Sequence, residues 1–157
     1  MSQPLTQVYE VYIRTTPAKL WEAMTNSAFT RRYYVGCSLE SDWVQGSPMV
    51  YTMEDGRIPF DAIIEVIEPE RRLVHSFKPR PKFWPGDEDE RESRVTYEIE
   101  QLGPSCLLRV THEHFAGETA TFKGTRRGWQ MILSGLKTLL ETGRPLEIAF
   151  SEEASVS

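Results

Sequence analysis

Residues Ala120 to Leu146 read ATFKGTRRGWQMILSGLKTLLETGRPL, and this stretch decides the fold. Its apolar residues recur at steps of three, four or seven, which places their side chains on one face of an α-helix. That face comprises Phe122, Trp129, Ile132, Leu133, Leu136, Leu139 and Leu140. Gly143 and Pro145 follow the last apolar turn and together form a strong helix stop. The spacing therefore predicts a long amphipathic helix that needs a broad apolar partner.

The part of the chain before this helix is predicted to supply that apolar partner. Along it, apolar and polar residues alternate. A period of two places alternate side chains on the same face of a β-strand, and turn residues separate the alternating runs. This pattern predicts strands over residues 7–14, 38–44, 49–53, 58–67, 72–78, 94–101 and 106–114. Thr16-Pro17 and Asn26-Ser27 are typical helix starts. We therefore expect two short helices, over residues 17–24 and 27–33, after the first strand.

This order of elements predicts an α+β fold with two layers. Short turns between consecutive strands imply an antiparallel sheet, and the alternation implies that one of its faces is buried. The long helix should lie across that face. A sheet that curls around a single helix can leave a gap, which is filled either by side chains or by a ligand.

Length and composition limit the class of protein. A chain of 157 residues with 39% apolar and 26% charged content is ordinary for a soluble protein. We expect a single domain over residues 1–150 and a disordered tail over residues 151–157. The net charge of −5 argues against a nucleic-acid binder. No apolar run is long enough to span a membrane and the N-terminus lacks a signal-peptide pattern, so we expect a cytoplasmic protein.

Residues 79–92 are typical of an exposed loop, because they combine prolines, a glycine and several acidic residues. Phe83 and Trp84 are unusual in this loop, since two large apolar rings in a polar segment fold back onto another surface. The sequence leaves two interpretations open. The rings form either a flap packed on the rim of the domain or a lid over a binding site.

Several segments resemble a known family, in the same order along the chain. The helix at Gly128–Leu146 is the most specific match. Further matches are TPAKLWEAMT at Thr16–Thr25, GSPMVYTMEDG at Gly46–Gly56, EVIEPERRL at Glu65–Leu73, RVTYEI at Arg94–Ile99 and LLRVTHEHF at Leu107–Phe115. Over residues 7–147 the chain resembles the domains similar to the heat-shock protein 90 ATPase activator, within the START-like (SRPBCC) superfamily.

The resemblance implies the helix-grip fold, a curved antiparallel sheet wrapped around the long C-terminal helix with a cavity between them. Members of the superfamily include carriers of lipids, hormones and polyketides, cyclases, resistance proteins and a chaperone activator, so the fold leaves the function open. The full co-chaperone carries an additional N-terminal domain that this chain does not include. We therefore do not expect the chain to activate the chaperone ATPase.

The three histidines are the candidates for reactivity. His112 and His114 fall on the same strand face, and His75 belongs to another inward set. Three imidazoles can bind zinc or move protons. However, His112 and His114 lie ~7 Å apart at the backbone and no thiolate or carboxylate has matching spacing, so we expect a polar lining and no metal. Gly124 and Gly128 lie within the helix instead of in a phosphate-binding loop, and we expect no cofactor.

Large apolar side chains converge on the predicted inward faces of separate elements. Packed together they form a core, whereas around a cavity they suit a flat or flexible apolar ligand. The sequence leaves both interpretations open. The expected cavity lining is Trp21, Met24, Met49, Tyr51, Met53, Phe60, His75, Phe77, Tyr97, Val110, His112, Trp129, Leu133 and Leu136, with Phe83 and Trp84 as the lid.

Three hypotheses for the function follow. The leading one is non-enzymatic binding of a small hydrophobic or aromatic molecule in a cavity between the sheet and the C-terminal helix. The second is a protein-interaction module related to the heat-shock protein 90 ATPase activator. The third is an enzyme of the cyclase or hydrolase type that uses the cavity histidines. The expected partners are thus a small hydrophobic or aromatic ligand or a protein, and no nucleic acid, with the chain as a monomer or homodimer.

Overall fold

The computed structural model describes residues 5–34, 36–80 and 91–148. In chain order its elements are β1 (Gln7–Ile13), α1 (Pro17–Thr25), α2 (Ser27–Tyr33), β2 (Ser38–Ser41), β3 (Pro48–Thr52), β4 (Phe60–Glu68), β5 (Arg72–Pro79), β6 (Ser93–Leu102), β7 (Ser105–Glu113) and α3 (Ala120–Thr142). Each predicted element is present, although β2 is shorter than predicted. The predicted lid residues Phe83 and Trp84, and the predicted tail, lie outside the described residues.

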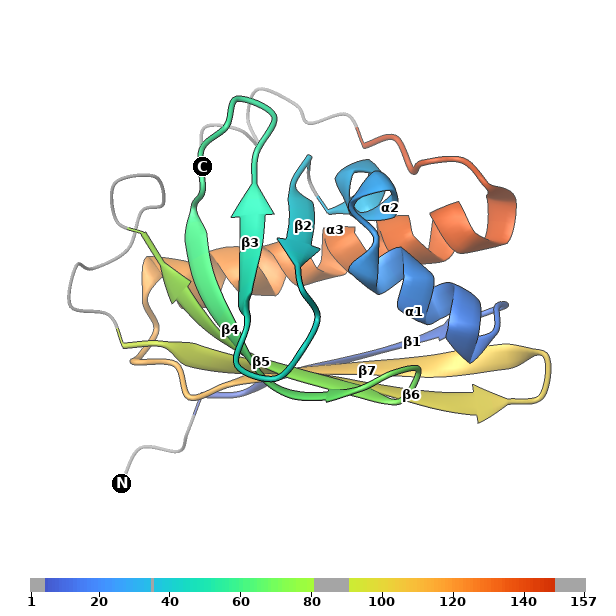
Figure 1. Ribbon diagram of the computed structural model, residues 1–157, viewed down its shortest axis with the longest axis horizontal. Helices are drawn as coiled ribbons and strands as arrows, with labels where there is room; N and C mark the ends of the chain where they lie inside the picture. The colour runs from blue at the N-terminus through green and yellow to red at the C-terminus, as the bar shows by residue number, and fades with distance from the viewer. Residues whose placement is uncertain (1–4, 35, 81–90, 149–157) are drawn as a thin grey trace.

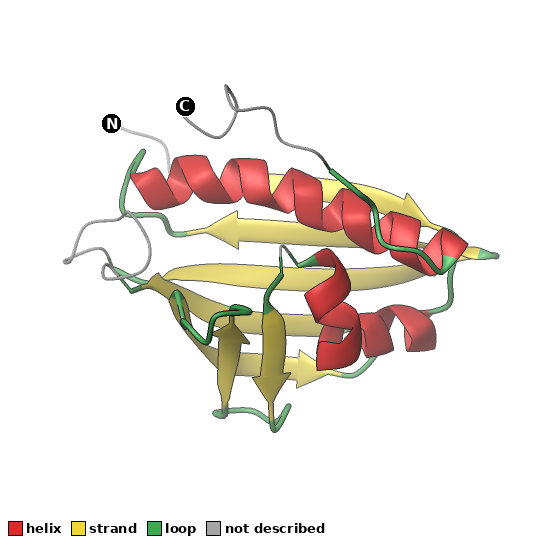
Figure 2. Ribbon diagram, turned by 90° about the horizontal axis from the view of Figure 1, so that it is seen from above, coloured by secondary structure: helices red, strands yellow, loops and turns green. Residues whose placement is uncertain are grey.

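The seven strands form one sheet in the order β1-β7-β6-β5-β4-β3-β2. The chain starts on one edge, crosses to the other edge through α1 and α2, and returns strand by strand, so that β1 pairs antiparallel with β7. Figure 1 shows that the sheet is curved and that α3 lies along its concave side. Figure 2 shows α1 and α2 beside α3 on that same side. This is the helix-grip arrangement, which confirms the predicted α+β fold.

α3 covers the stretch that the sequence predicts. The Thr119 hydroxyl caps its first turn by accepting a hydrogen bond from the backbone N–H of Phe122 (3.2 Å). Gly143 follows the last turn in a left-handed conformation (φ 79°), which glycine adopts without steric cost. The buried side is the predicted apolar face, with Phe122, Trp129, Ile132, Leu133, Leu136 and Leu139. Neither α3 nor any other helix in the described residues is long and apolar enough to cross a membrane.

Two short helices connect the edges of the sheet, and Asn26 separates them. Asn26 ends α1, and its side chain begins α2 by accepting a hydrogen bond from the N–H of Ala28 (2.9 Å). α2 then packs closely against α3, where a Cβ at Gly135 would lie 3.3 Å from the Cβ of Tyr33. A glycine at this position therefore allows the close approach, which places Tyr33 and Tyr34 against the concave side of the sheet.

The inward faces of most strands agree with the predicted alternation, but His114 and β5 depart from it. His114 lies beyond β7 with a positive φ of 66° and an exposed side chain, so the prediction that it shares the inward face with His112 is wrong. The strand ends before this residue, and the left-handed backbone breaks the alternation. In β5, Val74 and Ser76 are buried on the other face. There the Ser76 hydroxyl accepts a hydrogen bond from the N–H of Ile63 (3.0 Å), near the shift in register between β4 and β5.

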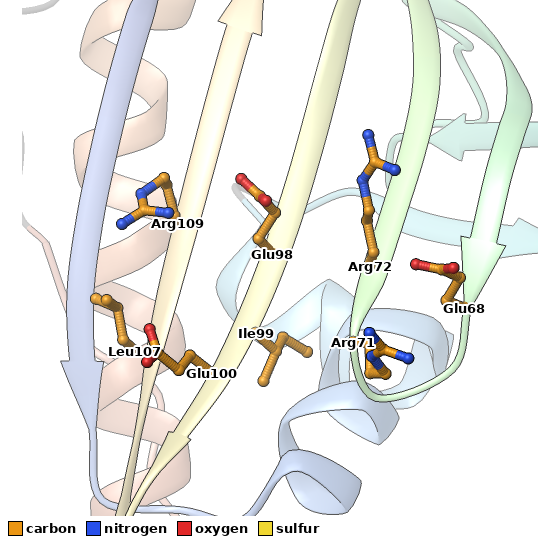
Figure 3. A pocket seen from close by; sticks show the side chains of 8 residues that line it. All are labelled: Glu68, Arg71, Arg72, Glu98, Ile99, Glu100, Leu107 and Arg109. Carbon is orange, nitrogen blue, oxygen red and sulfur yellow. The ribbon is translucent and has the colours of Figure 1, made fainter.

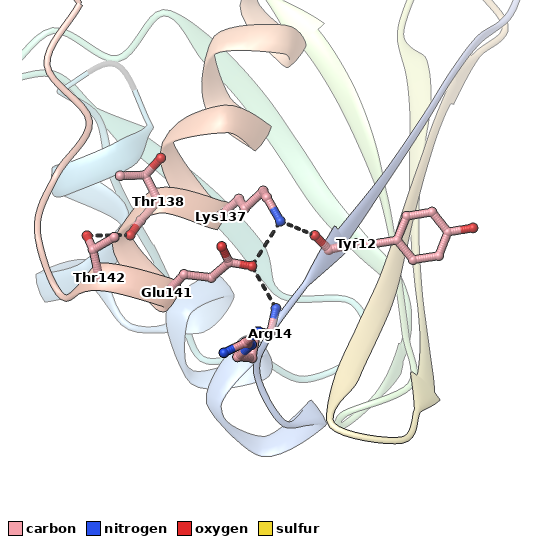
Figure 4. A network of polar contacts seen from close by, with 6 residues as sticks. All are labelled: Tyr12, Arg14, Lys137, Thr138, Glu141 and Thr142. Carbon is pink, nitrogen blue, oxygen red and sulfur yellow. Dashed lines mark hydrogen bonds and ion pairs between the residues drawn. The ribbon is translucent and has the colours of Figure 1, made fainter.

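The free edge of β1 is covered by side chains of α3 (Figure 4). β1 pairs only with β7 in the described sheet, which leaves one row of its backbone groups without a strand partner. Lys137 Nζ donates a hydrogen bond to the Tyr12 carbonyl (2.6 Å), and the Glu141 carboxylate accepts one from the N–H of Arg14 (2.9 Å). Lys137 and Glu141 also form an ion pair at 2.9 Å. These contacts attach α3 to the edge and protect it from pairing with another strand.

Candidate functional site

An apolar pocket opens between α3 and the part of the sheet formed by β4 and β5. Its volume is about 80 Å³, and it is lined by Tyr34, Cys37, Phe60, Phe77, Gly124, Thr125, Gly128, Trp129 and Ile132. We call this space the helix–sheet pocket. Gly128 leaves its α3 wall open, since a Cβ at this position would meet no atom within 4 Å. Gly124 lies one turn earlier on the same side of the helix, so the two glycines form a notch.

A second, smaller void lies deeper in the protein. Its volume is about 10 Å³, which is close to the minimum that holds one water molecule. The residues around this deep void are Met24, Tyr33, Tyr34, Leu39, Met49, Leu73, Tyr97, Ile132, Leu133 and Leu136. Tyr34 and Ile132 line both spaces. These two side chains therefore separate the helix–sheet pocket from the deep void.

Aromatic rings fill most of the interior beside these spaces. The ring of Tyr51 meets those of Phe60 and Phe77 edge to face, with centroids 5.5 and 5.9 Å apart. Tyr34 contacts Tyr51 and Trp129 in the same way, at 5.8 and 6.2 Å. Such pairs contribute ~0.5–1.5 kcal/mol each beyond the burial of their area. The interior is therefore largely packed, and the helix–sheet pocket is the open part on its helix side.

A chain of hydrogen bonds holds His112 in one tautomer. The indole N–H of Trp129 can only donate, and it donates to His112 Nδ1 (3.0 Å). The neutral ring therefore carries its proton on Nε2, which donates to the Ser93 hydroxyl (2.7 Å). Ser93 in turn donates to the carbonyl of Phe77 (3.2 Å). Burial, with the neighbouring His75 as a second cause, lowers the pKa of His112 to about 3.

The direction of these bonds argues against an activated serine at this place. A histidine that acts as general base needs a free lone pair on the nitrogen that faces the hydroxyl. In His112 that nitrogen carries the proton, and the lone pair of the other nitrogen is occupied by Trp129. Ser93 and His112 thus form a structural connection between β6, β7 and α3.

Among the described residues, two buried polar atoms of the aromatic cluster have no hydrogen-bond partner, namely the Tyr51 hydroxyl oxygen and His75 Nε2. His75 Nδ1 lies 2.8 Å from the Ser76 carbonyl, which can only accept. Nδ1 therefore carries the proton, and Nε2 has a free lone pair. Burial lowers the pKa of His75 to about 4, so the ring is neutral near pH 7. A buried polar atom without a partner costs ~1–3 kcal/mol, and such atoms call for an explanation.

The hydroxyls of Tyr34, Tyr51 and Tyr97 lie near enough to one another to influence each other's pKa. Burial raises the pKa of Tyr34 well above its ordinary value, and the hydroxyls of Tyr51 and Tyr97 are further causes. Burial also raises the pKa of Tyr51, the Tyr97 hydroxyl raises it further, and the Tyr34 hydroxyl lowers it to a smaller extent. All three phenols are therefore neutral at physiological pH, and a group that enters among them meets neutral donors and acceptors.

Most of the predicted lining residues lie together in one buried cluster. The buried members are Met24, Met49, Tyr51, Phe60, His75, Phe77, Tyr97, Val110, His112, Trp129, Leu133 and Leu136, and the partly buried ones are Trp21 and Met53. Phe60, Phe77 and Trp129 line the helix–sheet pocket. Met24, Met49, Tyr97, Leu133 and Leu136 line the deep void. The remaining six belong to the packed core, and ligand binding by any of these residues stays a prediction.

The sequence-based lining missed several residues of the helix–sheet pocket. Gly124 and Gly128 carry a signal that could have identified them, because each glycine inside a helix costs ~1 kcal/mol and therefore needs a reason. Their spacing of four places both on one side of α3, beside Trp129. Tyr34 follows the last residue of a helix, where no periodicity indicates the direction of a side chain. Cys37 lies in a connection and is equally unmarked.

In the part of the chain that the structure describes, the cysteine and histidine side chains do not form a reactive cluster. Within residues 5–34, 36–80 and 91–148, no group of three or more His, Cys, Asp or Glu side chains could hold a metal ion. Cys37 and Cys106 are buried free thiols. Burial raises the pKa of Cys37 to about 11, so it remains a thiol instead of a reactive thiolate. His114 lies apart from His75 and His112, and the three histidines do not converge.

The convex face of the sheet carries a charged groove (Figure 3). Its volume is about 230 Å³, and it is lined by Glu68, Arg71, Arg72, Glu98, Ile99, Glu100, Leu107 and Arg109. Arg72, Glu98 and Arg109 are cross-strand neighbours on β5, β6 and β7, so charges of opposite sign alternate across the sheet. This alternation is typical of a solvated surface and does not suit an apolar ligand.

Comparison with known proteins gave one family and many related structures. The family model described as "Activator of Hsp90 ATPase homolog 1-like protein" matches residues 14–141. The comparison with curated proteins gave no match. The solved structures are similar at low sequence identity, and identities of this size show the fold alone.

Three of these structures illustrate the similarity. CalU16 from Micromonospora echinospora has a TM-score of 0.72 at 19% identity, over 98% of this chain and 81% of that chain. Protein MLL2253 from Mesorhizobium loti has a TM-score of 0.70 at 20% identity, over 87% and 97% of the two chains. The Aha1 dimer from Colwellia psychrerythraea has a TM-score of 0.71 at 16% identity, over 88% and 98%. Because the family model covers most of the chain, this chain belongs to the family of activator of Hsp90 ATPase homolog 1-like proteins in the START-like (SRPBCC) superfamily, a family of ligand-binding or interaction domains.

Proposed function

We propose that the protein binds a small hydrophobic or aromatic molecule in the helix–sheet pocket and does not convert it chemically. The observation that supports this proposal is the pocket itself. It is an apolar opening of about 80 Å³ between α3 and the sheet, with Phe60, Phe77 and Trp129 in its walls. Concave apolar sites lined by aromatic side chains are typical binding sites for small molecules.

The volume of the pocket limits the size of the ligand. Pockets for drug-sized ligands measure ~300–1,000 Å³, whereas an apolar cavity of ~150 Å³ holds one benzene ring. At about 80 Å³, the helix–sheet pocket accepts part of one ring without any change. A whole ring requires a shift of Tyr34 or Ile132, the two side chains that separate the pocket from the deep void. The proposed ligand is therefore compact, with a single ring or a short branched chain.

The groups around the pocket favour binding over catalysis. Burial raises the pKa of the Cys37 thiol to about 11, which disfavours its use as a nucleophile. Burial also lowers the pKa of His75 to about 4, which makes its imidazole a weak base near pH 7. Ser93 faces a histidine nitrogen that carries a proton. These features support a non-enzymatic role.

Fluorobenzene observed by ¹⁹F NMR tests the proposal. We expect a saturable shift or broadening of its signal in the presence of the protein. Gly128→Leu places a side chain in the open space of the pocket and favours the helix by up to ~1 kcal/mol. This variant should therefore stay folded and lose the binding. Gln130→Leu adds the same side chain at an exposed position of α3 and should bind as the wild type does. Absence of saturation in the wild type, or equal binding by all three proteins, overturns the proposal.

The second candidate is an interaction module related to the heat-shock protein 90 ATPase activator. The match to the family model favours it. The charged groove on the convex face (Figure 3) is a surface where a protein partner would pair with Arg71 and Arg72. A pull-down with purified chaperone, together with the rate of ATP turnover by the chaperone, tests this candidate. No recovered chaperone and an unchanged rate exclude it.

A further inference from the structure

The two unpartnered polar atoms of the aromatic cluster stand in contrast to the rest of the buried polar side chains around them. Tyr51 and His75 are 1% and 0% exposed, and their rings are 6.4 Å apart. The hydroxyl of Tyr33, by comparison, donates to the carbonyl of Ala23 (2.8 Å). Both nitrogens of His112 also have partners. These two atoms therefore have hydrogen-bonding capacity that the described residues do not use.

The two side chains lie next to residues that line the helix–sheet pocket and the deep void. Tyr51 contacts the rings of Phe60 and Phe77, which are walls of the pocket. His75 contacts the ring of Tyr97 at 5.7 Å, and Tyr97 lines the deep void. The rings of Tyr51 and His75 therefore pack against side chains that line both spaces. Because the Tyr34 ring contacts that of Tyr51 at 5.8 Å, a guest that displaces Tyr34 comes next to the Tyr51 side chain.

The chemistry of the two atoms limits the group that can satisfy both. His75 Nε2 has a free lone pair and needs a donor, whereas the Tyr51 hydroxyl can donate. A carbonyl or ether oxygen can only accept and would leave Nε2 unpaired. A carboxylate or an ammonium group would bring a charge among neutral rings, which is costly without a counter-charge. A neutral hydroxyl group donates and accepts at once.

We propose that the ligand of the helix–sheet pocket is a compact aromatic or aliphatic molecule that carries one hydroxyl group, a phenol or an alcohol. Its hydroxyl accepts a hydrogen bond from Tyr51 and donates one to His75 Nε2, while its apolar part occupies the helix–sheet pocket. This inference rests on the proposed function and specifies the chemical class of its ligand.

Three probes of similar shape test the inference. p-Cresol carries a hydroxyl, 4-methylanisole carries an oxygen that only accepts, and toluene carries neither. NMR titration of the labelled protein gives a dissociation constant for each. We expect p-cresol to bind about tenfold more tightly than the other two, which corresponds to ~1.4 kcal/mol and to one or two net hydrogen bonds.

Two variants identify the atoms that recognise the hydroxyl. Tyr51→Phe removes only the unpartnered oxygen, and His75→Leu removes Nε2 at a similar side-chain volume. Each should retain toluene binding and lose most of the preference for p-cresol. Tyr12→Phe, on the exposed side of β1, removes a hydroxyl elsewhere and should keep the preference.

The outcomes separate this inference from the proposed function. If toluene binds to the pocket and p-cresol binds no more tightly, the inference is wrong and the proposed function stands. The same conclusion holds if the preference persists in both Tyr51→Phe and His75→Leu. If none of the three probes binds to the wild type, both proposals fail.

Discussion

Lowering the pH below 6.5 should destabilise the folded protein through His75 and His112. In the unfolded chain both imidazoles are exposed to water, where their pKa is ~6.5. In the fold, burial lowers the pKa of His75 to about 4 and that of His112 to about 3. Between these values the unfolded state binds protons that the folded state does not bind. Above pH 6.5 the two histidines therefore do not lower the free energy of unfolding. This free energy decreases as the pH falls from 6.5 towards the pKa of His75, about 4, and that of His112, about 3.

The two pKa shifts give the magnitude of the effect. At about pH 5, each imidazole is almost fully protonated in the unfolded chain and almost neutral in the fold. Each one lowers the free energy of unfolding by ~2 kcal/mol relative to about pH 8, or ~4 kcal/mol for both. Protein domains are stable by only ~5–15 kcal/mol, so this is a large share. The side chains packed around the two rings, such as Tyr51, Tyr97 and Trp129, carry no charge that would offset it.

Urea denaturation between about pH 8 and pH 5 measures this loss. The carboxylates with a lowered pKa, Asp55 and Glu141, titrate below this range, so the histidines dominate within it. The decrease in stability over this range measures the joint effect of His75 and His112. His75→Leu should remove about half of it. A stability that is constant over this range, or a buried imidazole that titrates near its ordinary pKa in the folded protein, refutes the reasoning.

Two further predictions concern the buried hydrogen bonds. Tyr51→Phe removes an unpartnered hydroxyl and should leave the free energy of unfolding unchanged or raise it by up to ~1 kcal/mol, whereas Tyr33→Phe breaks a 2.8 Å hydrogen bond and should lower it by ~1–2 kcal/mol. Urea denaturation of both variants checks this pair, and equal effects contradict it. Trp129→Phe leaves His112 Nδ1 without a donor and should cost ~2 kcal/mol or more. It should also raise the pKa of His112 in an NMR titration, and an unchanged pKa is evidence against the hydrogen-bond chain.

The elements that the sequence predicts well are those in which periodicity and burial agree. The apolar side of α3 and its stop at Gly143 are both confirmed. The inward set Leu108, Val110 and His112 is confirmed as well, because β7 pairs on both sides in a continuous register. Such patterns depend on the secondary structure alone, so one sequence is enough to predict them.

The helix–sheet pocket depends on relations that no local pattern contains. Its volume is a small difference between two large volumes, that of the space inside the curved sheet and that of the side chains that fill this space. Tyr34 enters that space because α2 packs against α3 at Gly135, a contact between elements far apart in the chain. Ser93 is the first residue of β6, and its hydroxyl gains a role only through His112 on the neighbouring strand. Tertiary contacts of this kind determine the site.

A guest molecule should bind between α3 and the sheet, and intermolecular NOEs between toluene and isotopically labelled protein locate it directly. We predict NOEs from toluene to the Hα protons of Gly128 and to the rings of Phe77 and Trp129, and their loss in Gly128→Leu. NOEs confined to exposed side chains of the convex face, such as Val8 and Tyr12, would contradict the claim.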